Sequence, residues 1–422
     1  LEIWLRGRLP QRLPLPVRSV SSWIVVIVLV FTLIHQAIPG LIIGGAEAAF
    51  SVRNDADPPN VERPTAAERS GSPGSLVPWE TLGAYGKRFV GRLNCAINVF
   101  HFSIAFFSAS VGFSLFTGQI THKVDADTDA ERAALVVDEL ERTGAASRSA
   151  VMIAPTTGTG WVDPIAALSL EVLYDGDTAI AAAQYSYLPS SVQFIADTDK
   201  ARASGRALVR AVVAWWKTLP EDDRPRLLLY GESLGVIAGE AAFSDLGDVV
   251  DSVDGVLWVG PPNSSRLWSD LVARRDPGTR EVDPTYSAGL TVRFAQDRDE
   301  METFVGDASW GDRRVLYIQH PSDPVVWWSP RLIRAPEPDW LRERAGTDRS
   351  PAMRWMPYIT FFQVSADLPR AMNVPHGHGH HYGTEILNGL ALVAHEEAFT
   401  AERVTQARQE VERALAAQPT DD

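Results

Sequence analysis

From Val124 onward, short apolar runs alternate with segments of helical spacing, and this alternation limits the possible folds more than any other feature of the chain. The apolar runs are predicted as strands and read SAVMIAP, TAIAAAQYSYLP, RLLLYG, GVLWVGPP and RVLYIQ. Thr128 and Glu131 form a capping box that begins the first helix, and Gly144 ends it. Because apolar strands that alternate with helices build a mostly parallel sheet covered on both faces, the sequence predicts an α/β fold.

The segment RLLLYGESLGVIAGEAAF, residues 226–243, places a serine on a turn between a strand and a helix. Ser233 lies between Gly231 and Gly235, which is the sequence form of a nucleophile elbow. The two glycines allow the strand and the helix to approach closely. Ligands of parallel sheets bind at the carboxyl ends of the strands, so Ser233 is a candidate nucleophile.

A serine nucleophile needs a base, and the base needs an acid that fixes its tautomer. In this kind of fold the acid follows the serine in the chain and the histidine follows the acid. Asp323, in RVLYIQHPSDPVVWW, lies in the loop after an apolar strand that we count as the second after the elbow. We expect Asp323 to be the acid. Asp297, after TVRFAQ, is the reserve candidate.

The candidate bases lie in VPHGHGHHYGTEI, which contains His376, His378, His380 and His381. We expect His380, shortly before a predicted helix, to be the base, and His378 is the second choice. Clustered histidines also bind metals, but the tract has neither nearby cysteines nor an HExxH pattern. We therefore expect no metal and no cofactor, although a structural role for the tract stays open.

The developing oxyanion needs hydrogen-bond donors. One donor should be the backbone N–H of Leu234, directly after the nucleophile, and the second should come from Thr157, Gly158 or Thr159 in VMIAPTTGTGWVDP. This loop lacks the lysine of a GxxxxGK[ST] phosphate loop.

Three tryptophans flank the predicted oxyanion and acid loops: Trp161, Trp327 and Trp328. As pocket walls they would favour an acyl or lipid-like substrate over a sugar phosphate, whereas core packing is the alternative role.

An apolar run from residue 23 to 43 is long enough to cross a bilayer as a helix. Four arginines precede it: Arg6, Arg8, Arg12 and Arg18. This charge asymmetry predicts a helix in the cell membrane whose N-terminal side is cytoplasmic. The catalytic domain that follows the helix would then be extracytoplasmic. A cleaved signal peptide is the alternative interpretation.

Residues 93–122 contain no charged side chain and many phenylalanines. They suit a second membrane span, an interfacial hairpin or buried strands of the sheet, and we favour a soluble or interfacial structure. A second span would invert the predicted orientation.

The chain is expected to comprise a membrane segment (1–51), a linker rich in Pro, Ser and Gly (52–78), and a catalytic domain (79–417). The net charge of −14 argues against a nucleic-acid partner. Cys95 is the single cysteine, so an intrachain disulfide is excluded. The sequence begins with leucine, and we expect a fragment or a processed product. The oligomeric state is not indicated.

Four motifs occur together: GESLG, TTGTGWVDP (156–164), QYSYLPS (184–190) and GHGHHY (377–382). With them, the chain from about residue 20 to 400 resembles a family of actinobacterial membrane-associated α/β-hydrolases, and SGSPGSLVPWETLG (70–83) is similar to its junction segment. The resemblance implies several membrane helices ahead of a serine-hydrolase site at Ser233, Asp323 and the Gly-His-Gly-His loop. The chain departs from the family in having one clear span and in residues 93–122, where the family has a more polar segment and an early strand.

These observations predict a membrane-anchored serine hydrolase that acts on small-molecule or lipid-like acyl esters or thioesters. An acyltransferase that uses the same residues and a non-catalytic envelope scaffold are the alternatives.

Overall fold

The computed structural model describes residues 57–92, 102–107, 128–190, 198–334 and 336–416, together with the isolated positions 21, 25, 50, 54, 193 and 194. The chain divides into two compact units, Leu1–Arg53 and Asn54–Asp422, and nearly all described residues belong to the second. The predicted membrane helix, 23–43, therefore falls almost wholly outside them. Among the described residues, no helix combines the length and the apolar character needed to cross a bilayer.

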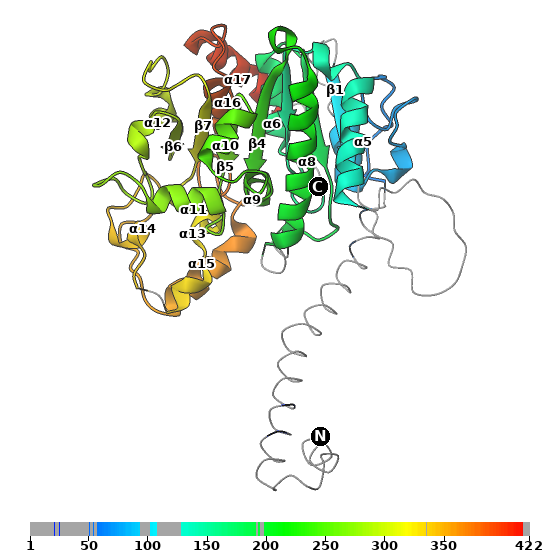
Figure 1. Cartoon of the computed structure of the whole chain (residues 1–422). Helices are drawn as coiled ribbons and strands as arrows, with labels where there is room; N and C mark the ends of the chain where they lie inside the picture. The colour runs from blue at the N-terminus through cyan, green and yellow to red at the C-terminus, as the bar shows by residue number, and fades with distance from the viewer. Residues whose placement is uncertain are drawn as a thin grey trace. The chain divides into compact units, whose positions relative to one another are not determined.

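The described part of the second unit is built on a seven-stranded sheet in which every neighbouring pair is parallel (Figure 1). The strands are β1 (Phe102–Phe107), β2 (Ala150–Ile153), β3 (Thr178–Ala183), β4 (Arg226–Glu232), β5 (Gly255–Val259), β6 (Val292–Ala295) and β7 (Arg314–Ile318). Their spatial order is β1-β3-β2-β4-β5-β7-β6. The predicted parallel α/β sheet is confirmed.

Helices cover both faces of the sheet (Figure 1). On one face lie α5 (Asp129–Arg142), α8 (Thr198–Thr218) and α9 (Leu234–Glu240), and on the other α6 (Pro164–Leu173), α16 (Glu385–Ala394) and α17 (Ala401–Ala416). Further α-helices of the described part are α4 (Ala84–Arg92), α10 (Leu246–Ser252), α11 (Arg266–Ala273), α12 (Arg298–Glu302), α13 (Pro324–Trp327), α14 (Asp339–Arg342) and α15 (Ile359–Asp367). Residues of β2, β3 and β5 are buried throughout, as expected for strands covered on both faces.

The capping box at the start of α5 is confirmed. The Glu131 N–H donates to the Thr128 hydroxyl at 3.2 Å, and the Thr128 N–H donates to the Glu131 carboxylate at 2.9 Å. Each bond satisfies a donor that the first turn of a helix leaves without an internal partner.

The charge-free stretch 93–122 contributes a strand. Phe102–Phe107 forms β1, which pairs in parallel with β3 at the edge of the sheet, and the other residues of the stretch lie outside the described ones. For the described part, a strand of the sheet is therefore the alternative that the structure supports.

Asp323 follows the third strand after the elbow in chain order, and not the second strand as the sequence predicts. TVRFAQ contains β6, so β7 is the third strand after the elbow in chain order. Because β7 lies between β5 and β6, it is nevertheless second in space from β4. The apolar pattern of β6 is broken by Arg293, whose guanidinium is buried over the Trp310 ring and paired with Asp307 at 2.9 Å.

The predicted linker is packed against the domain where the structure describes it. Ser70 and Val77 are buried. The Ser75 hydroxyl donates to the buried carboxylate of Glu139 on α5 at 3.0 Å, and the Leu76 N–H donates to the same carboxylate. Residues 57–78 contain no named helix or strand, and the bonds to Glu139 hold their C-terminal part against α5.

Candidate active site

The elbow is a sharp turn between β4 and α9. Ser233 has φ 55° and ψ −120°, a backbone conformation that costs a non-glycine residue about 1–3 kcal/mol. The Ser233 N–H donates to the carbonyl oxygen of Val259, at the end of β5, at 3.0 Å. The side chain is half-buried. Ser233 is thereby held at the carboxyl end of the sheet.

The two glycines of the elbow are explained by close approach rather than by positive φ. A Cβ on Gly231 would lie 2.6 Å from the Trp258 ring, and one on Gly235 would lie 2.5 Å from the Pro155 carbonyl oxygen. The predicted reason for both glycines is confirmed. The second contact also places the loop after β2 against the start of α9.

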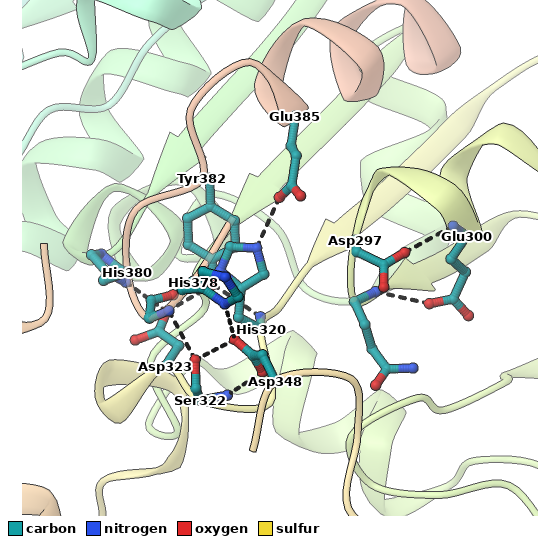
Figure 2. Close-up of polar contacts among 12 residues, drawn as sticks. Asp297, Glu300, His320, Ser322, Asp323, Asp348, His378, His380, Tyr382 and Glu385 are labelled. Atoms are coloured by element: carbon teal, nitrogen blue, oxygen red, sulfur yellow. Dashed lines mark hydrogen bonds and ion pairs between the residues drawn. The ribbon is translucent and has the colours of Figure 1, made fainter. Parts of the chain in front are cut away.

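Asp323 caps the N-terminus of α13 and is fully buried. One oxygen accepts a hydrogen bond from the Val325 N–H at 2.8 Å. The other lies 2.7 Å from Nδ1 of His380 and accepts from the Tyr382 hydroxyl at 2.7 Å (Figure 2). Burial raises the pKa of Asp323, but His380 and the donors of these hydrogen bonds lower it more, so that the pKa lies below its usual value. Asp323 is therefore a carboxylate, and Nδ1 of His380 carries the shared hydrogen.

The loop before His380 is tied down at several atoms. Gly379 has φ +53°, and its N–H donates to the Ser322 hydroxyl at 2.9 Å. The His380 N–H donates to the carbonyl oxygen of Ala371 at 2.8 Å. These bonds set the position of the imidazole before any substrate binds.

Nε2 of His380 is the ring nitrogen that makes no hydrogen bond to a described residue, and we call it the open nitrogen. It is buried and has no hydrogen-bond partner among the described residues. With Nδ1 donating to Asp323, Nε2 is an unprotonated acceptor in the neutral ring. The ring lies against Gly260, where a Cβ would be 2.7 Å from Nδ1, and Val259 just before it accepts the bond from Ser233. The His380 ring and the elbow therefore contact two adjacent residues at the end of β5, Gly260 and Val259.

The second candidate base lies elsewhere. The side chain of His378 is 53% exposed and pairs with Asp348 at 3.5 Å (Figure 2). Asp297, the reserve acid, caps α12 by accepting from the Glu300 N–H at 2.9 Å. The structure therefore brings together Asp323 and His380 and leaves His378 and Asp297 apart from them.

The other histidines of the tract contact one another and the backbone. The rings of His376 and His381 lie 4.0 Å apart, and Nδ1 of His381 donates to the Val374 carbonyl at 2.9 Å. No group of three or more His, Cys, Asp or Glu side chains suited to a metal ion occurs among the described residues.

The predicted oxyanion donors differ in availability. Leu234 is the first residue of α9, so its N–H has no carbonyl partner within the helix. The Thr157 N–H is already committed to the Trp161 carbonyl at 3.3 Å, whereas the Thr157 hydroxyl is buried and lacks a partner among the described residues. The Gly158 carbonyl accepts from the Ser186 N–H at 2.8 Å, which fixes the loop. A donor from Thr157 must therefore be its hydroxyl, not its amide.

The three predicted pocket tryptophans have different surroundings. Trp161 lines a small cavity with room for about one water molecule. Trp327 is buried against Trp268 and Trp340, and its indole N–H donates to the His320 carbonyl at 3.0 Å. Trp327 therefore packs the acid loop rather than lining this cavity. Trp328 is half-buried.

A pair of buried carboxyl groups beside the elbow was not singled out from the sequence. Asp163 and Glu232 are hydrogen-bonded to each other and line the same cavity as Trp161. The Tyr230 hydroxyl donates to Glu232 at 2.6 Å. Burial raises the pKa of Asp163 to about 6 and that of Glu232 well above its usual value. The pair therefore holds at least one proton near neutral pH. Both residues lie within motifs of the sequence, but nothing local shows that they meet.

A second histidine–carboxylate pair was also missed. Nδ1 of His320 lies 2.8 Å from the Gly379 carbonyl oxygen, and Nε2 lies 2.8 Å from the Glu385 carboxylate. Burial lowers the pKa of His320, but its contacts with Glu385 raise it more, so that the pKa lies above the usual value. Because both neighbours are acceptors, both nitrogens donate and the ring is an imidazolium. Its position three residues before Asp323 is the one local signal in the sequence.

A family model described as "Alpha/beta-hydrolase family" matches residues 117–407, and one described as "Alpha/beta-hydrolase family N-terminus" matches residues 2–92. No curated protein matches the chain. The first range includes strands β2 to β7 and the residues Ser233, Asp323 and His380.

Proposed function

Because the chain belongs to the alpha/beta-hydrolase family, we propose that it is a serine hydrolase that cleaves acyl esters through a covalent intermediate on Ser233. The observation that carries the proposal is the Asp323–His380 pair. The carboxylate fixes the hydrogen on Nδ1, and the remaining Nε2 is buried and unpartnered among the described residues. The ring lies against Gly260, and the preceding residue, Val259, accepts the hydrogen bond from the Ser233 N–H. A histidine in this state is ready to accept a proton from a serine hydroxyl.

The reaction follows from these positions. The Ser233 oxygen attacks the acyl carbonyl carbon while its proton moves to Nε2 of His380, and Asp323 stabilises the imidazolium that forms. The Leu234 N–H and the Thr157 hydroxyl donate to the oxyanion. When the intermediate collapses, the bond to the alcohol breaks and His380 returns the proton to the leaving oxygen. Water then releases the acyl group by the same steps, with His380 as the base.

The proposal includes a membrane anchor at residues 23–43 and an acyl or lipid-like substrate. The support for the anchor is the uncharged apolar run itself. The support for an apolar substrate is a cluster of aromatic rings near the acid loop. The half-buried Trp328 contacts Phe361 and Phe194, with ring centroids 5.9 and 5.4 Å apart. Acyl transfer to an acceptor other than water uses the same intermediate.

The test is hydrolysis of p-nitrophenyl esters of increasing acyl length by the detergent-solubilised full chain, with intact-mass analysis of the protein after brief exposure to substrate. We expect turnover and an added acyl mass that maps to Ser233, with both lost in Ser233→Ala. Ser269→Ala is the matched control, because this hydroxyl lies on α11 and donates to the Arg266 carbonyl. Turnover that persists in Ser233→Ala refutes the nucleophile. Ester binding without turnover or an adduct in the wild type favours a scaffold.

A further inference from the structure

An exposed apolar surface lies on and around α15. Ten large apolar side chains are exposed among the described residues, and half of them fall within residues 356–372. We call these five the α15 surface: Met356 (44% exposed), Tyr358 (46%), Ile359 (50%), Phe362 (66%) and Met372 (47%). Apolar side chains that gather in this way on a soluble surface mark a site of interaction.

Four exposed arginines lie in or near the chain segments that carry this surface. They are Arg331, Arg334, Arg354 and Arg370. Nε of Arg334 donates to the Tyr358 hydroxyl at 2.8 Å, so this guanidinium lies on the surface itself. None of the four forms an ion pair with another described residue. Residues 329–334 and 350–373 carry these four arginines and one acid, Asp367, a net charge of +3 in a chain of net charge −14.

The α15 surface adjoins the candidate active site. Figure 1 shows α15 next to α13, at the end of the sheet where α9 begins. The Trp328 indole, five residues after Asp323, donates to the Ser365 hydroxyl on α15 at 2.8 Å. Ala371, next to Met372, accepts the bond from the His380 N–H at 2.8 Å. Whatever binds the α15 surface is therefore brought close to the acid and histidine loops.

We propose that the α15 surface docks on a lipid bilayer that contains anionic lipids and presents the site to a membrane-borne acyl substrate. Apolar side chains enter the boundary between headgroups and acyl chains, and arginines at the same level are attracted by the anionic headgroups. The rest of the acidic surface is repelled, which favours this orientation. A second copy of the chain fits less well, because a two-fold contact would bring the same arginines together. The docking stands on the exposed side chains, and only the delivery of substrate rests on the proposed function.

The test is hydrogen–deuterium exchange of the full chain, followed by mass spectrometry, with vesicles of phosphatidylcholine alone or with added phosphatidylglycerol. We expect exchange across residues 356–372 to slow only with the anionic lipid and to recover in high salt. Ile359→Ser with Phe362→Ser, or Arg354→Gln with Arg370→Gln, should abolish the protection. The matched control is Leu290→Ser with Val305→Ser, which removes apolar side chains of similar exposure, 52% and 54%, outside the α15 surface.

Three results overturn the docking: no protection, equal protection on both vesicle types, or protection that appears without vesicles and grows with protein concentration, which indicates a second copy. Ser233→Ala should keep the protection, because it leaves the surface intact. Hydrolysis supplies the second readout: Ile359→Ser with Phe362→Ser should slow cleavage of a vesicle-borne ester several-fold and leave a soluble ester unaffected. Protection without hydrolysis of either ester removes the proposed function and leaves the docking in place.

Discussion

Two buried imidazoles, each paired with a carboxylate, lie side by side at the carboxyl end of the sheet, and they differ in how many acceptors face the ring. His380 donates to Asp323 through Nδ1, and its Nε2 has no partner among the described residues. His320 donates through both nitrogens, to the Gly379 carbonyl and to Glu385. The first ring can still accept a proton, whereas the second is already saturated.

Tyr382 connects the two pairs. Its ring stacks on the His320 ring at 4.1 Å. Its hydroxyl accepts from the backbone N–H of His320 at 3.3 Å and donates to Asp323 at 2.7 Å. The same two functional groups thus serve different purposes. We call Asp323 and His380 the open pair, and Glu385 and His320 the closed pair. The open pair moves a proton in the proposed reaction, while the closed pair holds Gly379, the residue before His380, in position.

The largest effect is expected for the open nitrogen. His380→Gln should lower kcat about 10⁴- to 10⁶-fold, because it removes the base that accepts the serine proton. His378→Gln, on an exposed side chain that does not bond Asp323, should change kcat by less than about tenfold. Ester hydrolysis by both variants, with thermal unfolding to verify the fold, makes the comparison. Equal losses in the two variants would contradict the assignment of His380.

Asp323→Asn should lower kcat about 10⁴-fold, because an amide that donates to Nδ1 leaves the hydrogen on Nε2. Tyr382→Phe removes one donor to the same oxygen and keeps the tautomer, so we expect about a tenfold loss. The ratio of kcat values in Asp323→Asn and Tyr382→Phe separates control of the tautomer from simple support of the carboxylate. If the two losses are the same, the comparison between open and closed pairs fails.

A smaller effect is expected for the closed pair. Glu385→Gln should lower kcat about 10- to 100-fold, because Gly379 and the His380 ring shift together. The pKa of His320 is raised in the folded state. The stability from this pair is therefore fully present below the ordinary histidine pKa of about 6.5 and is lost as pH rises through the folded pKa.

The difference in Tm between wild type and Glu385→Gln should accordingly be greatest in mild acid and shrink at alkaline pH. Glu397→Gln, which changes an exposed glutamate beyond the end of α16, is the control and should show no such trend. NMR of labelled imidazoles gives a direct view of the charge. If His320 carries a single ring hydrogen near pH 7, it is not an imidazolium and the contrast between the two pairs is wrong.

The smallest effect concerns the carboxyl pair beside the elbow, which has no imidazole at all. Its raised pKa values mean that stability is greatest below the ordinary carboxyl pKa and falls as pH rises through about 6 for Asp163. Glu232→Gln keeps an acceptor for Tyr230 and supplies a donor to Asp163. We expect it to be about 1–2 kcal/mol more stable than wild type near pH 8, with little difference near pH 4. Urea unfolding at the two pH values measures this. A variant that is less stable near pH 8 would show that Glu232 is ionised without cost.

The sequence predicts the parts of this site that depend on neighbouring residues. The strand before Ser233, the close glycines, the aspartate after an apolar strand and the histidine before a helix are all local patterns. The closed pair is not local, because His320 lies 59 residues from Gly379 and 65 from Glu385. Asp163 and Glu232 likewise meet only because the loop after β2 packs against the end of β4.

Two adjacent tryptophans also show that local sequence cannot predict which side chains meet in the fold. Trp327 and Trp328 are neighbours in the sequence, and composition gives them one predicted role. The short helix α13 turns Trp327 into the core beside Trp268 and leaves Trp328 half-buried against Phe361. β6 was missed for a related reason, since the buried Arg293 interrupts its apolar pattern.

The central claim is that the open nitrogen of His380 activates Ser233, and the rate of fluorophosphonate labelling tests it most directly. The full chain, wild type and His380→Gln, is reacted with the probe across a range of pH, and the labelled peptide is mapped by mass spectrometry. We predict labelling at Ser233 in the wild type that is strongly slowed in His380→Gln at every pH. Labelling at another residue, or an equal rate at Ser233 in both proteins, would contradict the account.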